Sequence, residues 1–139
     1  MLVGEIMTKE VVSIDSNDTV LNACLKYRDK KIGCLIVTEE EQCVGILTER
    51  DIIVRAVCPV KDPRNTKVKE IMSSDIKSIH PLDKIDVAIE EMKKYKIKKL
   101  PVISDNSLVG ILTIADIGKS KPEMTERFME SWIKPRWID

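Results

Sequence analysis

The chain has 139 residues, of which 43% are hydrophobic and 33% are charged, and its 23 basic residues balance its 23 acidic residues. This length suits one compact domain, or two half-sized units that share a core. The composition excludes a disordered chain and a membrane span, and the neutral balance argues against a general nucleic-acid or membrane-surface binder. The N-terminus has no apolar signal-peptide core, which predicts a cytoplasmic protein.

An internal repeat organises the chain. A shift of 65 residues aligns Val3–Ile52 with Val68–Ile117 without a gap, and Glu5–Met7 is identical to Glu70–Met72. Most of the other aligned pairs exchange one apolar residue for another. We therefore predict a first repeat over residues 1–58, a linker over 59–67, a second repeat over 68–118, and a C-terminal helix and tail over 119–139.

Each repeat is predicted to open with a short β-segment and a helix. The β-segments are Val11–Ile14 and Ile76–Ile79, and the helices are expected to begin at Asp18 and Asp83, a residue type favoured as an N-cap. Apolar residues recur at helical spacing in both helices and predict one buried face on each: Ile85, Ala88, Ile89, Met92 and Tyr95 in the second repeat, and Val20, Ala23, Cys24 and Tyr27 in the first.

Two short strands around a polar turn, and then a second helix, complete each repeat. The predicted elements are strands Cys34–Val37 and Cys43–Leu47 with helix Glu49–Val57, then strands Leu100–Ile103 and Leu108–Leu112 with helix Ile114–Gly118. The fold class is therefore α/β (α+β), with the order β-α-β-β-α twice. A unit of this size cannot bury its open sheet face alone, so we expect the repeats to pack through their sheets about an internal pseudo-two-fold axis, forming two related clefts.

Few residues are candidates for catalysis or metal binding. His80 is the only histidine, and we expect it on the surface. The chain has no P-loop, no G-x-G-x-x-G and no Cys/His ligand cluster, so we predict that it is not an enzyme and holds no metal. The four cysteines form no C-x-x-C pair and are expected to be small apolar core residues in a reducing compartment: Cys24, Cys34, Cys43 and Cys58.

Two motifs recur in both repeats, and a third stands between them in the second repeat. They are V-x-E-I-M at Val3–Met7 and Val68–Met72, L-P-V-I at Leu100–Ile103, and G-I-L-T-x-x-D-I at Gly45–Ile52 and Gly110–Ile117. In this order the repeat resembles the CBS domain, named after cystathionine beta-synthase, and residues 1–118 resemble a stand-alone tandem CBS (Bateman) module. The resemblance implies a regulatory module that needs no cofactor and binds AMP, ADP, ATP or S-adenosylmethionine. Similar pairs regulate inosine monophosphate dehydrogenase and the AMP-activated protein kinase.

The resemblance also implies which residues bind the ligand. Thr48 and Asp51, with their counterparts Thr113 and Asp116, match the family's hydroxyl and its ribose-binding aspartate. A carboxylate suits this role because it accepts hydrogen bonds from both ribose hydroxyls. The T-x-x-D spacing also fits a helix capping box, and one residue can serve both roles.

Basic residues beside these positions are expected to contact phosphate. They are Arg50, Lys98 and Lys99, and because their counterparts are Ala115, Gly33 and Cys34, we expect one fully equipped cleft rather than two. The alternative for the lysines is a solvated helix end, where cations complement the helix dipole. The preceding Glu90 and Glu91 and the lack of interleaved aromatic residues argue against nucleic acid.

Val12 and Lys77 complete the predicted site. They lie in Met7–Ile14 and Met72–Ile79, which match the family's adenine-contacting stretch. Each stretch is expected to serve the cleft whose threonine and aspartate come from the other repeat.

The C-terminal segment is the predicted docking element. Ser120, Pro122 and Glu123 predict a helix start and Pro135 its end. An apolar stripe is expected to dock on its own domain or on a homodimer partner, with an effector protein as the alternative: Met124, Phe128, Met129, Trp132 and Ile133. The resemblance implies a homodimer. No effector domain is evident, so we expect any output to reach a partner in trans. The competing function is a ligand-free structural or dimerisation module.

Overall fold

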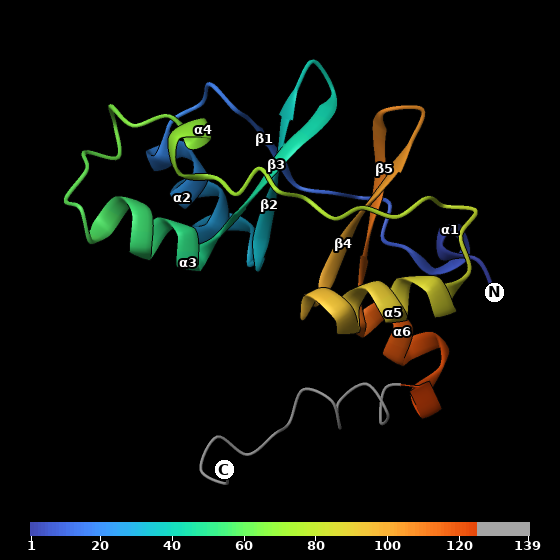
Figure 1. The fold of residues 1–139 in the computed structure, drawn as a ribbon. Helices are drawn as coiled ribbons and strands as arrows, with labels where there is room; N and C mark the ends of the chain where they lie inside the picture. Colours follow the sequence, from blue (N-terminus) through green and yellow to red (C-terminus); the bar gives the residue numbers. More distant parts are fainter. Residues whose placement is uncertain (125–139) are drawn as a thin grey trace, which may run out of the picture. The chain divides into compact units, whose positions relative to one another are not determined.

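The computed structural model describes residues 1–124, which fall into two compact units (Figure 1). The β1–β3 unit is Val11–Ile76, and the β4–β5 unit joins Met1–Glu10 to the chain from Lys77 onward. The first ten residues therefore belong with the second repeat, and the segment after the linker belongs with the first. Most of the predicted C-terminal stripe, from Phe128 to Ile133, and Pro135 lie outside the described residues.

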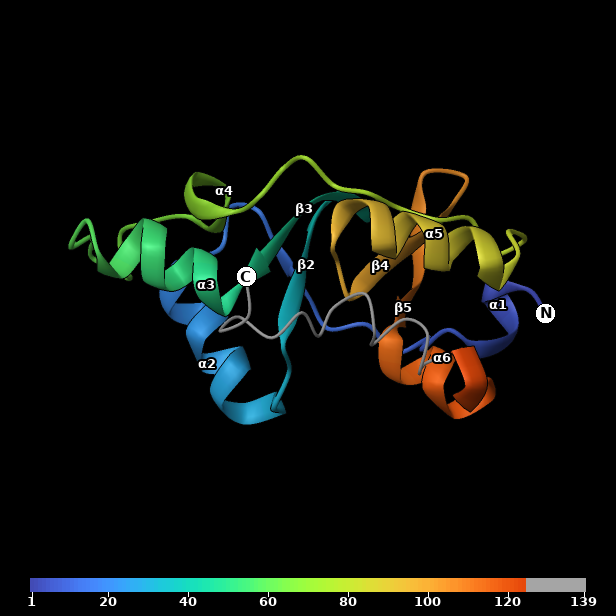
Figure 2. The same ribbon diagram turned by 60° about the horizontal axis from the view of Figure 1, so that its bottom comes forward.

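The β1–β3 unit is a three-stranded sheet with helices on one face. β1 (Ser13–Asp15) is parallel to β2 (Cys34–Glu39), which pairs antiparallel with β3 (Gln42–Thr48). Alternation along the strands turns one set of apolar side chains towards the helices. The helices are α2 (Val20–Lys30), α3 (Glu49–Ile52), a π-helical segment (Ile53–Val57) and α4 (Val68–Ile71) (Figure 2). All of these elements except α3 contribute buried side chains to one core: Ile14, Val20, Ala23, Leu35, Val37, Leu47, Ala56, Val68 and Ile71.

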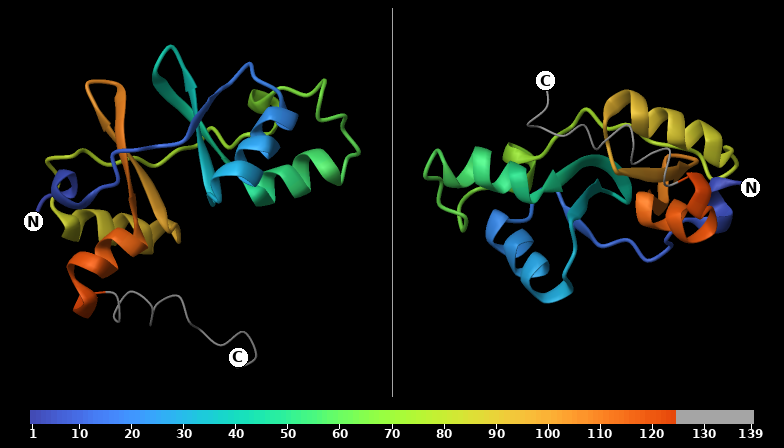
Figure 3. Two further views of the ribbon diagram at one scale, coloured as in Figure 1. Left: turned by 180° about the vertical axis from the view of Figure 1, so that it is seen from behind. Right: turned by 90° about the horizontal axis from the view of Figure 1, so that it is seen from below.

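The β4–β5 unit repeats this plan with a smaller sheet. β4 (Lys99–Ser104) and β5 (Ser107–Thr113) form an antiparallel hairpin whose tip points away from the helices (Figure 3). The helices are α1 (Val3–Ile6), α5 (Ile85–Tyr95) and α6 (Ile114–Ser120). Their shared core is formed by Val3, Ile79, Ile85, Ala88, Ile89, Met92, Leu100, Val102, Leu112 and Ile117, with Met124 packed against it.

The predicted order β-α-β-β-α is confirmed in the first repeat, but the predicted strand Ile76–Ile79 is wrong apart from one bridge, Ile79 with Val102. Pro101 explains the difference. In the first repeat the Ile36 N–H donates to the Val12 carbonyl at 3.3 Å. The counterpart of Ile36 is Pro101, which has no N–H to donate, so the ladder cannot extend along this segment.

The predicted helix starts are one residue early. The N-caps are Thr19 and Lys84. Thr19 accepts a bond from the Asn22 N–H at 3.1 Å, while Asp18 accepts from the Thr19 N–H at 2.8 Å. Asp83 accepts instead from the His80 N–H at 3.0 Å and closes the preceding loop. Both aspartates therefore organise the turn before the helix.

The predicted apolar face of α5 is buried except at one end, whereas on α2 Val20 and Ala23 are buried and Cys24 and Tyr27 are half-buried. Ile85, Ala88, Ile89 and Met92 are buried, whereas Tyr95 is 38% exposed at the last position of α5. His80 is exposed, as predicted. The cysteine prediction is wrong for Cys58, which is exposed after the π-helical segment, while the other three cysteines are half-buried. None of the four forms a disulfide.

Candidate functional site

The Asp51 site, defined here as Thr48, Asp51 and Ser73, lies where β3 ends and α3 begins. The Thr48 hydroxyl accepts from the Asp51 N–H at 3.2 Å, and Asp51 Oδ2 accepts from the Thr48 N–H at 2.9 Å. This is the predicted capping box. The second oxygen, Oδ1, accepts from the Ser73 hydroxyl at 3.4 Å. Asp51 is only 8% exposed, so its carboxylate is held in one orientation by groups from both repeats.

The Asp116 site, defined as Thr113, Asp116 and Thr8, has the same geometry at the end of β5. Asp116 Oδ2 accepts from the Thr113 N–H at 2.9 Å, and the Thr113 hydroxyl accepts from the Asp116 N–H at 3.1 Å. Asp116 Oδ1 accepts from the Thr8 hydroxyl at 3.1 Å. Thr8 is the counterpart of Ser73, so each aspartate meets a hydroxyl carried by the other repeat.

Gly45 and Gly110 allow the segments that carry Ser73 and Thr8 to approach strands β3 and β5 closely. The backbones of Ser73 and Ile46 exchange two hydrogen bonds of 2.9 Å, and those of Thr8 and Ile111 do the same. A Cβ on Gly45 would lie 2.9 Å from the Ser73 carbonyl oxygen, and a Cβ on Gly110 would lie 2.9 Å from the Thr8 carbonyl oxygen. Only glycine leaves room for the close approach.

The two sites differ in the residue opposite the capping threonine. Cys34 pairs with Thr48 across β2 and β3, whereas Lys99 pairs with Thr113 across β4 and β5. Directly paired residues in an antiparallel sheet project to the same face. The structure thus brings a lysine of the predicted set to the Asp116 site and a thiol to the Asp51 site.

The other two predicted phosphate ligands are exposed. Arg50 lies on α3 between the exposed Glu49 and the buried Asp51. The Lys98 carbonyl accepts from the Ile114 N–H at 3.1 Å, which places its backbone at the start of α6. Arg50 is therefore adjacent to Asp51 in sequence, and the Lys98 backbone lies beside the start of the helix that carries Asp116.

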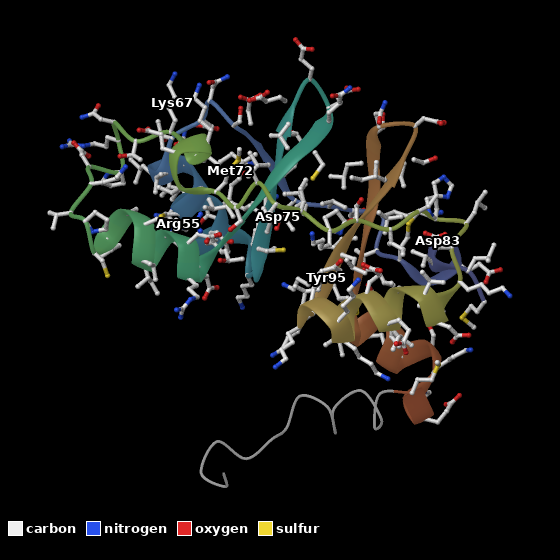
Figure 4. The ribbon with its side chains drawn as sticks, in the orientation of Figure 1. Arg55, Lys67, Met72, Asp75, Asp83 and Tyr95 are labelled. Atoms are coloured by element: carbon white, nitrogen blue, oxygen red, sulfur yellow. The ribbon has the colours of Figure 1, made fainter. Side chains whose placement is uncertain are left out.

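Val12 and Lys77 are both half-buried. Tyr95 lies at the end of α5 (Figure 4). Lys77 Nζ lies 4.7 Å from the centre of its ring, and Lys94 Nζ lies 5.1 Å from it. Lys77 and Asp51 belong to different units, as do Val12 and Asp116. The adenine-contacting roles of Val12 and Lys77 stay predictions.

Tyr27 is a neighbour of the Asp51 site that the sequence assigned only to a helix face. Its hydroxyl donates to the Leu47 carbonyl at 2.6 Å. Burial raises the pKa of Tyr27 well above its usual value, and electrostatic interactions with Cys34, Glu49 and Asp51 raise it further. The helical spacing placed Tyr27 on the inner face of the helix. It could not show this bond, because the acceptor carbonyl lies near the end of β3, in another part of the sequence.

Within residues 1–124 there is no group of three or more His, Cys, Asp or Glu side chains that could hold a metal ion. In the same part of the chain no helix is both long and apolar enough to cross a membrane.

Together, the doubled fold and the doubled capping aspartate define a pair of CBS domains. The family model described as "CBS domain" matches residues 3–57 and 68–120. The chain belongs to the CBS domain family, as the sequence motifs predicted.

Relatives and solved structures agree with this assignment. The CBS domain-containing protein YhcV of Bacillus subtilis is 31% identical over 115 residues, which are 83% of this chain and 81% of that protein. A protein with CBS domains from Burkholderia ambifaria is 28% identical, with a TM-score of 0.77 over 86% of this chain and 93% of the other. The CBS domain pair of protein MJ0100, solved with 5′-methylthioadenosine and S-adenosyl-L-methionine, is 30% identical, with a TM-score of 0.75 over 86% and 94%.

Proposed function

We propose that this protein is a regulatory sensor that binds an adenosyl ligand, AMP, ADP, ATP or S-adenosylmethionine, at the Asp51 site, the Asp116 site or both. One observation carries the proposal. In the first turn of the helix after its last strand, each repeat carries an oriented aspartate whose two carboxylate oxygens have different partners, a capping N–H and a hydroxyl from the other repeat.

Such a carboxylate suits a ribose. Each oxygen accepts one hydrogen bond in the structure and has a further lone pair available. Two adjacent ribose hydroxyls can donate to these lone pairs, and a carboxylate that is already oriented loses little freedom on binding. The known complex of the MJ0100 pair supports adenosyl ligands as a class.

The two sites differ in the basic residues that are available to contact a phosphate. Lys99, opposite Thr113, offers a cation to a phosphate at the Asp116 site. At the Asp51 site Cys34 takes that position, and Arg50 is the predicted phosphate contact. The proposal therefore includes phosphate contacts by Lys98 and Lys99 in one site and by Arg50 in the other.

The proposed output is a change of conformation and not a chemical reaction. A ligand can shift a conformational equilibrium only by its difference in affinity for the two states. We propose that the shifted state is read by a partner protein in trans, with 119–139 as the segment that contacts it.

A thermal-shift titration against AMP, ADP, ATP, S-adenosylmethionine and guanosine nucleotides tests the ligand class. A ligand at 100 times its Kd adds about 2.7 kcal/mol to the native state and raises Tm by several degrees. A saturating shift with adenosyl ligands, and none with guanosine nucleotides, supports the proposal. No shift with any adenosyl ligand contradicts it.

A dimerisation module is the second candidate, and one surface favours it. Three apolar side chains in and after the π-helical segment are largely exposed: Ile53 at 57%, Val57 at 63% and Val60 at 88%. Exposed apolar side chains so close together are typical of association surfaces. Sedimentation of the wild-type chain and of Val57→Glu tests this candidate. A wild-type dimer that Val57→Glu dissociates supports it, and a monomeric wild-type chain contradicts it.

A further inference from the structure

Arg55 makes a contact that the two repeats do not share. Its Nη1 donates to the Met72 carbonyl at 3.0 Å and to the Ile71 carbonyl at 3.2 Å. Figure 4 labels both ends of this contact, Arg55 on the helical segment after α3 and Met72 at the end of α4. A charged guanidinium that binds two successive backbone carbonyls fixes that turn more strongly than a neutral donor does.

The turn that Arg55 holds leads directly into the Asp51 site. Met72 caps α4, and the next residue is Ser73, whose hydroxyl meets Asp51 and whose backbone pairs with Ile46. The contact from Arg55 therefore acts one residue away from a group that orients the Asp51 carboxylate.

The helix that carries Arg55 also departs from its counterpart. It changes from α to π geometry at Ile53, with the Cys58 N–H donating to the Ile53 carbonyl at 2.9 Å. In the second repeat α6 stays α-helical to Ser120. Ser120 is the counterpart of Arg55, and its short uncharged side chain cannot make the same double contact. Single π-helical turns recur at functional positions in helices.

We propose that Arg55 is a positioning residue that pre-forms the Asp51 site, so that the two sites bind the same adenosyl ligand with different affinity. The inference rests on the proposed function. Arg55 acts through Met72 and Ser73 and does not need to touch the ligand. Because Arg55 adds a contact to this turn that the matching turn lacks, we expect the Asp51 site to lose less freedom on binding than the Asp116 site.

Isothermal titration with AMP, and separately with S-adenosylmethionine, tests the inference on variants that isolate each site. In an Asp116→Asn background, Arg55→Ala is expected to weaken binding at the Asp51 site about tenfold. In an Asp51→Asn background the same change is expected to leave the Asp116 site unaltered. Arg64→Ala, which removes an exposed arginine from the same unit, and Ser120→Ala are the matched controls and are expected to change neither site.

Hydrogen exchange separates positioning from a general loss of stability. Arg55→Ala is expected to speed exchange of the Ser73 amide relative to the Thr8 amide, which has the same bridge in the other unit. Arg55→Lys, which keeps the positive charge and N–H donors but not the planar guanidinium, is expected to restore part of the affinity. Unchanged affinity of the Asp51 site in Arg55→Ala, or an equal loss at both sites, overturns the inference alone. No binding of either ligand to the wild-type chain overturns the proposed function, and the inference with it.

Discussion

The Thr8 hydroxyl donates to the Asp116 carboxylate at 3.1 Å across 108 residues of sequence. The equivalent bond joins Ser73 to Asp51. In each contact the hydroxyl comes from the leading segment of the other repeat, so neither repeat supplies all the residues of its own site. Under the proposed function this exchange couples the repeats, because a ligand on one aspartate also restrains a segment that belongs to the other repeat.

The close approach of these segments depends on glycine. We expect Gly110→Ala to lower the free energy of unfolding by about 1–3 kcal/mol, because the new Cβ meets the Thr8 backbone, which is paired to β5 and cannot move freely. Gly45→Ala is expected to do the same at Ser73. Denaturant unfolding measures both, with the exposed Gly33→Ala as the control. A loss no greater than that of Gly33→Ala would contradict the role of the glycines.

The β2–β3 turn stores backbone strain. Glu40 and Glu41 have φ angles of 49° and 68°, in the left-handed region that favours Asn and Gly. Replacing the pair with Asn-Gly is expected to raise the free energy of unfolding by about 1 kcal/mol or more. The β4–β5 turn already has Asp105 and Asn106 at these positions, so Asn106→Gly is the control and is expected to gain less. Equal gains in the two turns would show that strain at the glutamates is not the cause.

Tyr27 predicts a dependence of stability on alkaline pH. Its pKa is raised in the folded state above the reference value of 10.0, mainly by burial. The hydroxyl therefore contributes stability fully below pH 10.0, and this contribution is lost as the pH rises further towards the folded pKa. Tyr27→Phe removes the bond to Leu47 and is expected to cost about 1 kcal/mol at neutral pH.

Unfolding of both proteins between pH 8 and pH 11 measures this effect. The wild-type advantage over Tyr27→Phe is expected to shrink above pH 10.0, while other titrating groups act on both proteins alike. An advantage that is constant across this range would contradict the assignment.

The sequence predicted most of the helices and strands because the same residue pattern occurs in both halves of the chain. The repeat period placed both hairpins, and the T-x-x-D spacing placed both capping boxes, since both patterns depend on neighbouring residues. The sequence pattern predicted a strand at Ile76–Ile79 and did not indicate its absence, because the N–H that Pro101 lacks belongs to a residue more than twenty positions away in the sequence. Arg55 escaped notice for a similar reason, since its partners are backbone carbonyls that leave no mark in the sequence.

The candidate site was predictable only in part. Charge and hydroxyl chemistry, together with the family resemblance, pointed to Asp51 and Asp116 and to the segments that meet them. The distinct surroundings of the two aspartates follow from strand register, which pairs Cys34 with Thr48 and Lys99 with Thr113. Nothing in the spacing of the motifs singles out Tyr27 as a neighbour of Asp51.

Calorimetric titration of AMP and S-adenosylmethionine into the wild-type chain, Asp51→Asn, Asp116→Asn and the double variant tests the central claim most directly. Asp29→Asn, which removes an exposed carboxylate from the β1–β3 unit, is the control. Asparagine retains much of the shape and capping capacity of aspartate but loses the charge and one acceptor oxygen. We predict that the double variant binds at least tenfold more weakly than the wild-type chain, while Asp29→Asn binds normally. A double variant that binds either ligand as tightly as the wild-type chain would contradict the assignment of Asp51 and Asp116 as ribose-binding residues.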